Sequence, residues 1–261
     1  MSRARTIVLS GAGSGIGRAA ARRLAGDGFH VTAVGRRKEP LDQLAAEADR
    51  AGLRGVVPPG QRPQIGVIAA DVATELGATS VATQVASSGM ACAGVICAAG
   101  GIAGATPGAD GLDAIRLDWQ ASFESNVLTA VLLTEALRDQ IERDAGRVVL
   151  ISSVAALRGS GGGPYGAMKA ALHGWVYDLA ADLGPHGGTA NVIAPGFVPD
   201  TEFWAGRLTA DSRQRRAAQT LVGREGRPEE IASLIAWLLG PDGGWVTGQI
   251  ISPNGGVVLG R

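Results

Sequence analysis

The chain has 261 residues, of which 46% are apolar and 18% charged, and its 24 basic and 24 acidic residues cancel. This composition excludes a disordered chain, and the zero net charge favours neither nucleic acid nor an anionic membrane as a partner. No run of 18 apolar residues predicts a membrane span, and no apolar leader of signal type precedes the first predicted strand. Two cysteines, Cys92 and Cys97, are few for a metal site, so we expect a reduced, cytoplasmic protein without a metal.

Short apolar runs alternate with amphipathic ones along the chain. The apolar runs predict strands at 6–10, 29–35, 64–70, 93–98, 147–152, 189–194 and 250–252. The amphipathic runs predict helices at 16–25, 40–51, 74–87, 114–142, 164–183 and 228–239. Residues 53–64 contain Pro58, Pro59 and Pro63 and are predicted to be a surface excursion. The alternation predicts one α/β domain over 1–261, a Rossmann-type doubly wound sheet of about seven parallel strands with right-handed crossovers, covered by helices on both faces as a three-layer sandwich.

A glycine-rich turn, Ser-Gly-Ala-Gly-Ser-Gly-Ile-Gly over 10–17, joins the first predicted strand to the first helix. Glycines permit a tight turn and let the backbone approach a pyrophosphate, which the helix N-terminus then attracts. The Gly-x-x-x-Gly-x-Gly spacing is weaker evidence than the commoner Gly-x-Gly-x-x-Gly, and among 40 glycines chance clusters are expected. The position of the turn favours a dinucleotide site, with Gly11, Ser14, Gly15, Ile16 and Gly17 as its contacts.

The end of the second predicted strand indicates which dinucleotide is bound. A site for NAD presents an Asp or Glu about 20 residues after the glycines, where it bonds the ribose 2′-hydroxyl. Here the strand runs into Gly35-Arg36-Arg37-Lys38, without a carboxylate. Guanidinium groups bind phosphate in a bidentate manner, so Arg36 and Arg37 favour NADP(H) over NAD(H). The alternative interpretation is a solvated basic turn.

A Ser/Tyr/Lys arrangement follows the fifth predicted strand. The strand ends in Ser152 and Ser153, and a glycine-rich loop leads to a helix that carries Tyr165 and Lys169. Residues four apart share one face of a helix, so the phenol and the ammonium can point into one pocket with the serine hydroxyls. A fixed cation favours the phenolate, which suits a proton-transfer site. Taken alone, Tyr-x-x-x-Lys is more often a surface pair.

Further motifs accompany these residues in a fixed order. They are Ser10–Gly17, Asp71-Val72, Ala98-Ala99-Gly100, Asn126, Ser153, Tyr165, Lys169, Asn191–Gly196, Gly226–Ile231 and Val246–Gly256. In this ordered set the chain resembles the short-chain dehydrogenase/reductase family in its single-domain form, over essentially its whole length. Within the family it is most similar to bacterial 3-oxoacyl-thioester reductases.

The resemblance implies a catalytic tetrad of Asn126, Ser153, Tyr165 and Lys169. Tyr165 would be the general acid in reduction and the base in oxidation, and Ser153, rather than Ser152, would hydrogen-bond the substrate oxygen. Lys169 would bind the nicotinamide ribose and lower the pKa of the tyrosine. Asn126 would hold a water in a proton relay toward Lys169, although a lone helical Asn is usually solvated or locally bonded.

The resemblance also implies contacts to the cofactor. Asp71 and Val72 would meet the adenine, although Asp71 could instead cap the next helix. The ribose would lie along Ala98-Ala99-Gly100, a motif in which Cys97 and Ala98 replace the usual two asparagines.

On the nicotinamide side, Pro195 and Gly196 would form the adjacent turn. Val198 and Thr201 would meet the carboxamide, with Thr201 one residue later than the family spacing because Pro199 and Asp200 lengthen the loop.

The family places its substrate pocket between the segments that here are 101–110, 154–164 and 197–222, the last as a substrate lid. The aromatic residues Phe197, Phe203 and Trp204 could line an apolar pocket or pin a mobile lid. The arginine run 213–216 is interpreted as a solvated face.

Three functions fit these observations. The first is NADP(H)-dependent reduction of a ketone, an oxoacyl thioester or a polyketide-type carbonyl, to a secondary alcohol with Tyr165 as proton donor. The second is NAD-dependent oxidation of an alcohol, polyol or sugar, and the third is a non-catalytic dinucleotide-binding scaffold. The expected partner is a small-molecule substrate. The resemblance also implies further copies of the chain, a homotetramer or else a dimer, formed through 114–142, 164–183 and the C-terminal segment.

Overall fold

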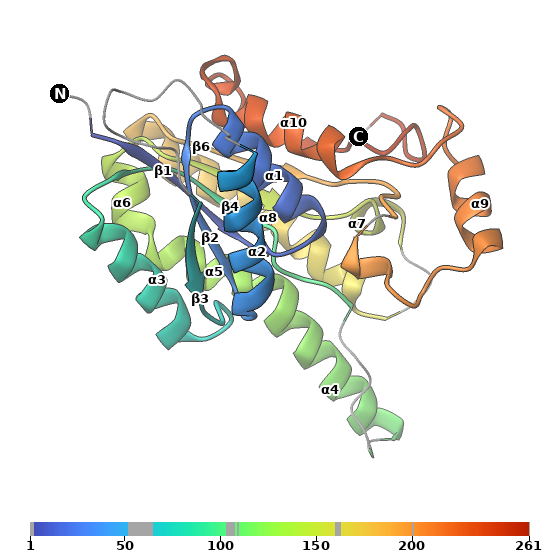
Figure 1. The fold of residues 1–261 in the computed structure, drawn as a ribbon. Coiled ribbons are helices and arrows are strands. Elements are labelled where there is room, and N and C mark those ends of the chain that lie inside the picture. Colours follow the sequence, from blue (N-terminus) through green and yellow to red (C-terminus); the bar gives the residue numbers. More distant parts are fainter. Residues whose placement is uncertain are drawn as a thin grey trace.

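The computed structural model describes residues 3–51, 65–102, 108, 110–159, 163–199 and 201–260. The whole predicted excursion at 53–64, several residues of the predicted pocket segments and Asp200 lie outside these ranges. Seven parallel strands form one sheet in the order β3-β2-β1-β4-β5-β6-β7 (Figure 1). The strands are β1 (Arg5–Ser10), β2 (His30–Gly35), β3 (Ile65–Ala69), β4 (Ala91–Cys97), β5 (Arg147–Ile151), β6 (Thr189–Ile193) and β7 (Ile250–Ile251). The predicted fold class is confirmed.

The central strands are buried on both faces. In β1 every residue after Arg5 is buried, and β6 is buried throughout. Burial on both faces explains why these strands read as continuous apolar runs instead of alternating ones. Because the strands are parallel, their carboxyl ends lie at one edge of the sheet, where the predicted motifs follow them.

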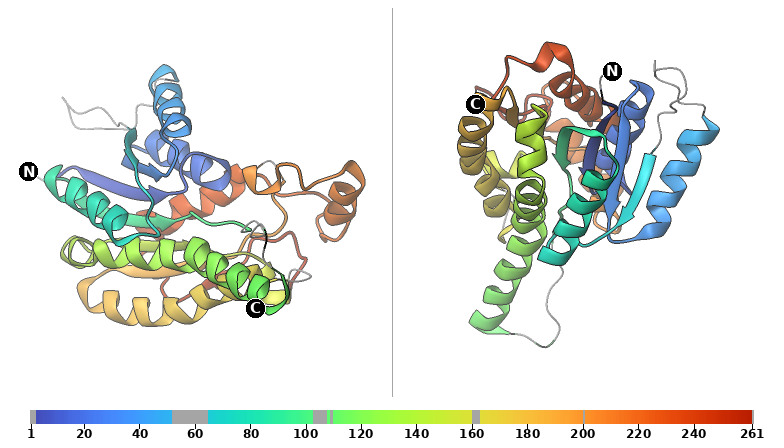
Figure 2. Two further views of the ribbon diagram at one scale, coloured as in Figure 1. Left: turned by 90° about the horizontal axis from the view of Figure 1, so that it is seen from below. Right: turned by 90° about the vertical axis from the view of Figure 1, so that its left-hand side faces the viewer.

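Two helical layers cover the sheet from opposite sides (Figure 2). Helices α1 (Gly15–Gly26), α2 (Lys38–Arg50) and α10 (Pro228–Leu239) bury their apolar sides in one core cluster. Helices α3 (Glu75–Ser87), α5 (Thr129–Ala136), α6 (Arg138–Arg143) and α8 (Tyr165–Leu183) bury theirs in the other. This arrangement is the predicted three-layer sandwich.

The predicted helix at 114–142 is wrong as a single element. It consists of α4 (Gly111–Phe123), a π-helical turn η1 (Glu124–Leu128), α5 and α6. A break at Leu137, where φ is −99° and ψ is 0°, separates α5 from α6. Figure 1 shows α4 reaching beyond the body of the sheet. Periodicity could not reveal the π-helical turn, because a single turn is too short for an apolar pattern that is read over about 11–18 residues.

The sequence analysis missed several short elements. They are α7 (Ala155–Arg158), η2 (Gly184–His186), η3 (Glu202–Trp204), α9 (Ala210–Ala218) and η4 (Pro241–Gly243). Helix α9 buries none of its residues, so it has no apolar stripe to detect. Its start was nevertheless readable, because Thr209 and Ser212 form a reciprocal capping box.

The strand order reverses beside β1, whose neighbours are β2 on one side and β4 on the other. In doubly wound sheets the crevice outside the carboxyl ends at such a switch point is where ligands bind. The glycine turn that follows β1 and the Ala98-Ala99-Gly100 segment that follows β4 therefore meet at the expected place.

Within the described ranges no helix combines the length and the apolarity that crossing a membrane requires. The same ranges contain no group of three or more His, Cys, Asp and Glu side chains arranged to hold a metal ion.

Substitutions at two glycines, one in the first turn and one as a control, test how tightly that turn is packed. A Cβ on Gly17 would lie 2.2 Å from the carbonyl oxygen of Gly11, whereas a Cβ on Gly174, in α8, would meet no atom within 4 Å. We expect Gly17→Ala to lower the free energy of unfolding by about 1–3 kcal/mol through overpacking. Gly174→Ala should raise it by about 0.5–1 kcal/mol through helix propensity. Urea unfolding of both variants measures this, and equal effects would contradict the close packing at Gly17.

Candidate active site

The glycine turn brings the backbone ends of β1 and β4 into contact. Gly11 has φ +70°, and a Cβ on it would lie 2.7 Å from the carbonyl carbon of Ala98. The hydroxyl of Ser10, at the end of β1, accepts a hydrogen bond of 3.3 Å from the N–H of Ala99. Both contacts hold the turn against the segment that follows β4.

The N-terminus of α1 offers donors to an anion. Its N-cap, Ser14, makes no capping hydrogen bond through its side chain, and the first turn carries no acidic residue. The first N–H groups of a helix lack partners within the helix, and the helix dipole places positive charge there. These residues fit the phosphates of a dinucleotide.

Gly100 lies in the segment that follows β4, where the chain passes η1 and α8. Its φ is +146°, and a Cβ there would be 2.7 Å from Oδ1 of Asn126 and 2.9 Å from Nζ of Lys169. No side chain fits between these two groups, so a glycine is required at this position.

Asn126 is 1% exposed and lies in the π-helical turn η1. Its Nδ2 donates to the carbonyl of Gly101 at 2.8 Å, and its Oδ1 accepts from the N–H of Gly101 at 3.0 Å. Its side chain therefore fixes the backbone that follows β4, next to Lys169. A role in a water relay stays a prediction.

Lys169 is a buried cation with few partners. It is 4% exposed, and its Nζ donates to the carbonyl of Ile151 at 3.0 Å. Burial removes water from the ammonium and lowers the pKa of Lys169 to about 8.

Tyr165 departs from the expectation that the lysine lowers the pKa of its phenol. Burial raises the pKa of Tyr165 to about 12, and the hydrogen bond with Ser153 lowers it only in part. Nζ of Lys169 lies 5.9 Å from the centroid of the Tyr165 ring and is directed to the carbonyl of Ile151. Desolvation of the phenol therefore outweighs the charge of the lysine.

The two adjacent serines have different partners. The Ser152 hydroxyl donates to the carbonyl of Lys169 at 2.9 Å and lies 2.7 Å from Nε2 of His173. The Ser153 hydroxyl bonds Tyr165 and accepts from the N–H of Ala155 at 3.1 Å. Ser152 thus ties β5 to α8, and Ser153 faces the phenol.

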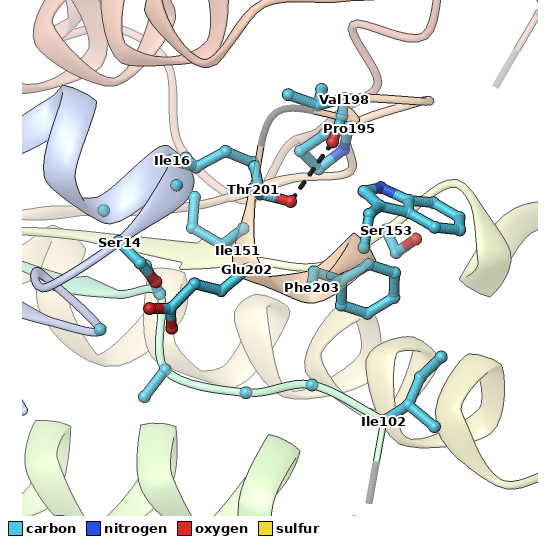
Figure 3. A pocket seen from close by; sticks show the side chains of 18 of the residues that line it. Ser14, Ile16, Ile102, Ile151, Ser153, Pro195, Val198, Thr201, Glu202 and Phe203 are labelled. Carbon is cyan, nitrogen blue, oxygen red and sulfur yellow. Dashed lines mark hydrogen bonds between the residues drawn. The ribbon is translucent and has the colours of Figure 1, made fainter. Parts of the chain in front are cut away.

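A cavity of about 370 Å³ opens at the carboxyl edge of the sheet (Figure 3). The predicted site residues that line it are Gly11, Ser14, Gly15, Ile16, Gly17, Ala98, Ala99, Gly100, Ser153, Tyr165, Lys169, Pro195, Gly196, Val198 and Thr201. The turn after β6 is packed closely here, because a Cβ on Gly196 would lie 2.6 Å from Cα of Asn254. The predicted residues outside the lining are Arg36, Arg37, Asp71, Val72 and Asn126.

The basic turn after β2 is connected to the cavity by an ion pair between Arg37 and Glu202. Arg37 donates to the Glu202 carboxylate at 2.5 Å, and Glu202 itself lines the cavity. Lys38 pairs with Asp42 at 2.6 Å. Arg36 is exposed and makes no ion pair with a described residue. Of the two predicted arginines, Arg36 is thus the one whose charge is not neutralised by a neighbour.

Asp71 does not cap the next helix, which corrects the alternative given above. The N-cap of α3 is Thr74, whose hydroxyl accepts from the N–H of Gly77 at 3.1 Å. The Asp71 carboxylate accepts from the N–H of Ala73 at 3.1 Å and is exposed, while Val72 is buried in the core.

The segment 201–207 lies across the cavity. A Cβ on Gly15 would lie 2.9 Å from the side chain of Thr201, so Thr201 lies directly against the glycine turn. Figure 3 shows Glu202 on the side of Ser14 and Phe203 on the side of Ser153. The ring of Phe203 lies 5.4 Å from that of Tyr165. This segment therefore contacts both the glycine turn and the predicted proton donor.

The expected solvated face at 213–216 is wrong for two of its arginines. Arg213 pairs with Glu225, and Arg216 lies over the Trp204 ring at 4.8 Å. Arg215 is exposed and pairs with Asp211. Helix α9 directs Arg213, Arg215 and Arg216 to different sides. The run of arginines in the sequence does not show which of them face the protein.

Sequence reasoning also missed Glu202, Arg207 and His173. His173 follows Lys169 by four residues, so helical spacing could have placed it on the same face. Nothing in the local sequence marks Glu202 and Arg207, because their place at the cavity depends on how the loop after Gly196 folds.

Comparison with known proteins identifies relatives over nearly the whole chain. A family model described as enoyl-(acyl carrier protein) reductase matches residues 11–258. The short-chain reductase protein NovJ of Streptomyces niveus is 34% identical over 95% of this chain and 92% of that protein. The 3-oxoacyl-(acyl-carrier-protein) reductase FabG of Thermotoga maritima is 31% identical over 97% of each. The solved RhlG/NADP active-site complex of Pseudomonas aeruginosa has a TM-score of 0.84 at 28% identity, over 98% of this chain and 97% of that one.

Burial of Lys169 predicts a stability that depends on pH. Because its pKa falls from 10.5 to about 8 on folding, the unfolded chain binds more protons between these values, and stability rises with pH across that window. The penalty is fully present below pH 8. Lys169→Met should therefore raise the free energy of unfolding at pH 7 by about 1–3 kcal/mol, net of the lost bond to Ile151.

Urea unfolding of wild type and Lys169→Met at pH 7 and above pH 10.5 measures the effect, and the difference should shrink at the higher pH. Lys38→Met, at an exposed position, is the control. The same difference at both pH values would contradict the burial of a charge.

Proposed function

Because the chain belongs to the short-chain dehydrogenase/reductase family, we propose that it uses NADP(H) to reduce a ketone to a secondary alcohol. As a member of that family it is an NAD(P)-dependent oxidoreductase of CH–OH and C=O groups. The observation that carries the proposal is the meeting of Ser153, Tyr165 and Lys169 in one cavity with the glycine turn.

The residues have distinct roles in the proposed reaction. When bound, the reduced nicotinamide supplies the hydride that the carbonyl carbon accepts. Tyr165 donates its phenolic proton to the carbonyl oxygen, and Ser153, already hydrogen-bonded to the phenol, holds that oxygen. Lys169 is placed to bind the ribose, and Asn126 keeps the adjoining backbone in position through Gly101.

The protonation state of the Tyr165 phenol supports its role as proton donor. With burial raising the pKa of Tyr165 to about 12, the phenol is protonated at neutral pH. A protonated phenol can donate its proton to a carbonyl oxygen directly.

The basic turn supports NADP(H) over NAD(H). The end of β2 carries no carboxylate for a ribose 2′-hydroxyl, and Arg36 has no described anionic partner. A 2′-phosphate would supply that partner. The P. aeruginosa relative was solved as an NADP complex, which is consistent with the proposal.

The substrate enters, on this proposal, through a second cavity of about 360 Å³ that shares Ser153 and Tyr165 with the first. Its walls include Phe197, Phe203 and Trp204. Residues 197–222 act as the substrate lid of the single domain 1–261. The names of the relatives support an oxoacyl thioester or a polyketide-type carbonyl as the substrate.

An exposed apolar stripe supports a homo-oligomer. Leu112, Ile115, Trp119 and Phe123 recur on α4 at intervals of three and four residues, and each is 41–84% exposed. A stripe of this kind on a protruding helix favours a partner helix. We propose a tetramer, or else a dimer, that buries this stripe.

Removing the phenolic hydroxyl tests the proton donor. Tyr165→Phe should lower the rate of NADPH-dependent ketone reduction by about 10²–10⁴-fold and leave the dissociation constant for NADPH within about threefold. Tyr177→Phe, at an exposed position on the same helix, should leave both unchanged. The measurements are initial rates by NADPH absorbance and binding by fluorescence. Residual activity near that of wild type would exclude Tyr165 as the donor.

The basic turn can be tested at Arg36, which makes no ion pair with a described residue, and at Glu202, the acidic partner of Arg37. Arg36→Ala should weaken NADPH binding by about tenfold or more, and NADH binding by less than twofold. Glu202→Gln frees Arg37 and should tighten NADPH binding by about two- to fivefold, as expected for an exposed ion pair. Glu229→Gln, at another exposed acid, should change nothing. Equal changes for both cofactors would remove the argument for a 2′-phosphate site.

A further inference from the structure

A chain of aromatic contacts runs from the proposed proton donor along the second cavity. The ring of Tyr165 lies 5.4 Å from that of Phe203, and Phe203 lies 5.0 Å from Trp204 at 81°. Trp204 in turn meets Phe197 at 5.3 Å and 80°. These four rings line a continuous apolar wall that starts where the carbonyl of a substrate would accept its proton.

A guanidinium group lies at the far end of this wall. The Cζ atom of Arg216 is 4.8 Å from the ring centroid of Trp204 and 5.9 Å from that of Phe197, and the side chain lines the same cavity. A second cation, Arg158, also lines it and donates to the amide oxygen of Gln219 at 3.3 Å.

No acidic side chain is present among the described lining residues to balance these two charges. The neighbours of Arg216 on α9 differ, because Arg213 pairs with Glu225 and Arg215 with Asp211. Arg216 makes neither an ion pair nor a hydrogen bond with any described side chain or backbone group, although it is half-buried. Its donors are therefore free to take an anion from the cavity.

We propose that Arg216, assisted by Arg158, binds an anionic group of the substrate, a carboxylate or a phosphate, that is separated from the reacting carbonyl by a flat or apolar portion. The wall of rings receives that middle portion, and Ser153 and Tyr165 receive the carbonyl. This inference rests on the proposed function, since it takes the Ser153/Tyr165 end as the reacting end.

The chemistry of guanidinium supports this assignment. Contact with an aromatic face engages the π-facing side of the cation, while its N–H donors lie in its own plane and suit a bidentate oxyanion. A charge-assisted hydrogen bond in a half-buried site is worth about 1.5–3 kcal/mol, or about 10- to 150-fold in affinity. That range is enough to select an anionic ketone over its neutral counterpart.

Two pairs of ketones test the proposal. The members of each pair differ only in one anionic group, a carboxylate in one pair and a phosphate in the other. The carboxylate pair is 4-acetylbenzoate and its methyl ester, and the phosphate pair is 4-acetylphenyl phosphate and its dimethyl ester. For each compound kcat/KM is measured with NADPH, and its affinity for the protein loaded with NADP⁺ is measured by calorimetry. The protein is the full chain.

The variants separate charge from packing. Arg216→Met keeps an apolar stem over Trp204 and should lower kcat/KM and affinity for the anionic member of at least one pair by about 10- to 100-fold, with less than threefold change for the neutral member. Arg216→Lys should restore part of the loss. Arg215→Met, at the adjacent position that is paired with Asp211, should leave the ratio between the two members unchanged.

The pair that responds identifies the anion as carboxylate or phosphate. Equal losses for both members, or no loss, would show that Arg216 only packs against Trp204 and would overturn the proposal. Failure of both anionic compounds to bind would also overturn it. Binding that depends on Arg216 without any reduction would support the anion site and refute the proposed reductase instead.

Discussion

Two hydrogen bonds between the Asn126 amide and the backbone of Gly101 hold the end of β4 against the helical run beneath it. Beside that contact Gly100 passes between Asn126 and Lys169 with no room for a side chain. The π-helical turn at η1 gives Asn126 its place, and local departures of this kind are frequent at functional sites. The cavity wall at Gly100 and the position of Lys169 both depend on this close approach of the segment after β4 to η1 and α8.

Helix α8 holds the two titratable side chains of the candidate site in a place where burial disfavours their charged forms. Its first turns present Tyr165 and Lys169 to the cavity, where Lys169 is buried and Tyr165 half-buried, so both lose water that would stabilise their charged forms. The helix is held in place by the Ser152 hydroxyl and the carbonyl of Ile151, both at the end of β5. The strand end thus compensates, through directed hydrogen bonds, for part of what desolvation costs.

The sheet, its helices and the cavity-lining glycines could be predicted because their signals are local. The glycine spacing over 10–17 indicates a dinucleotide-binding turn. The helical spacing of Tyr165 and Lys169 indicates that the two side chains share one face. The high pKa of Tyr165 could not be predicted, since it depends on rings and loops far away in sequence that exclude water. The same holds for Arg216 and Glu202, whose neighbours Trp204 and Arg37 are fixed by the path of one loop. The break at Leu137 left the apolar pattern of the helix intact and so gave no signal either.

The two cysteines lie inside the sheet that supports the site. Cys97 ends β4 with its Sγ 3.5 Å from the hydroxyl of Thr134, and Cys92 lies near the start of the same strand. Burial raises the pKa of Cys97 to about 11 and that of Cys92 to about 12, so neither forms appreciable thiolate at neutral pH. A thiol reagent can reach them only when β4 separates from its helices. The rate at which this chain is alkylated therefore reports the opening of its central strand, with no engineered probe.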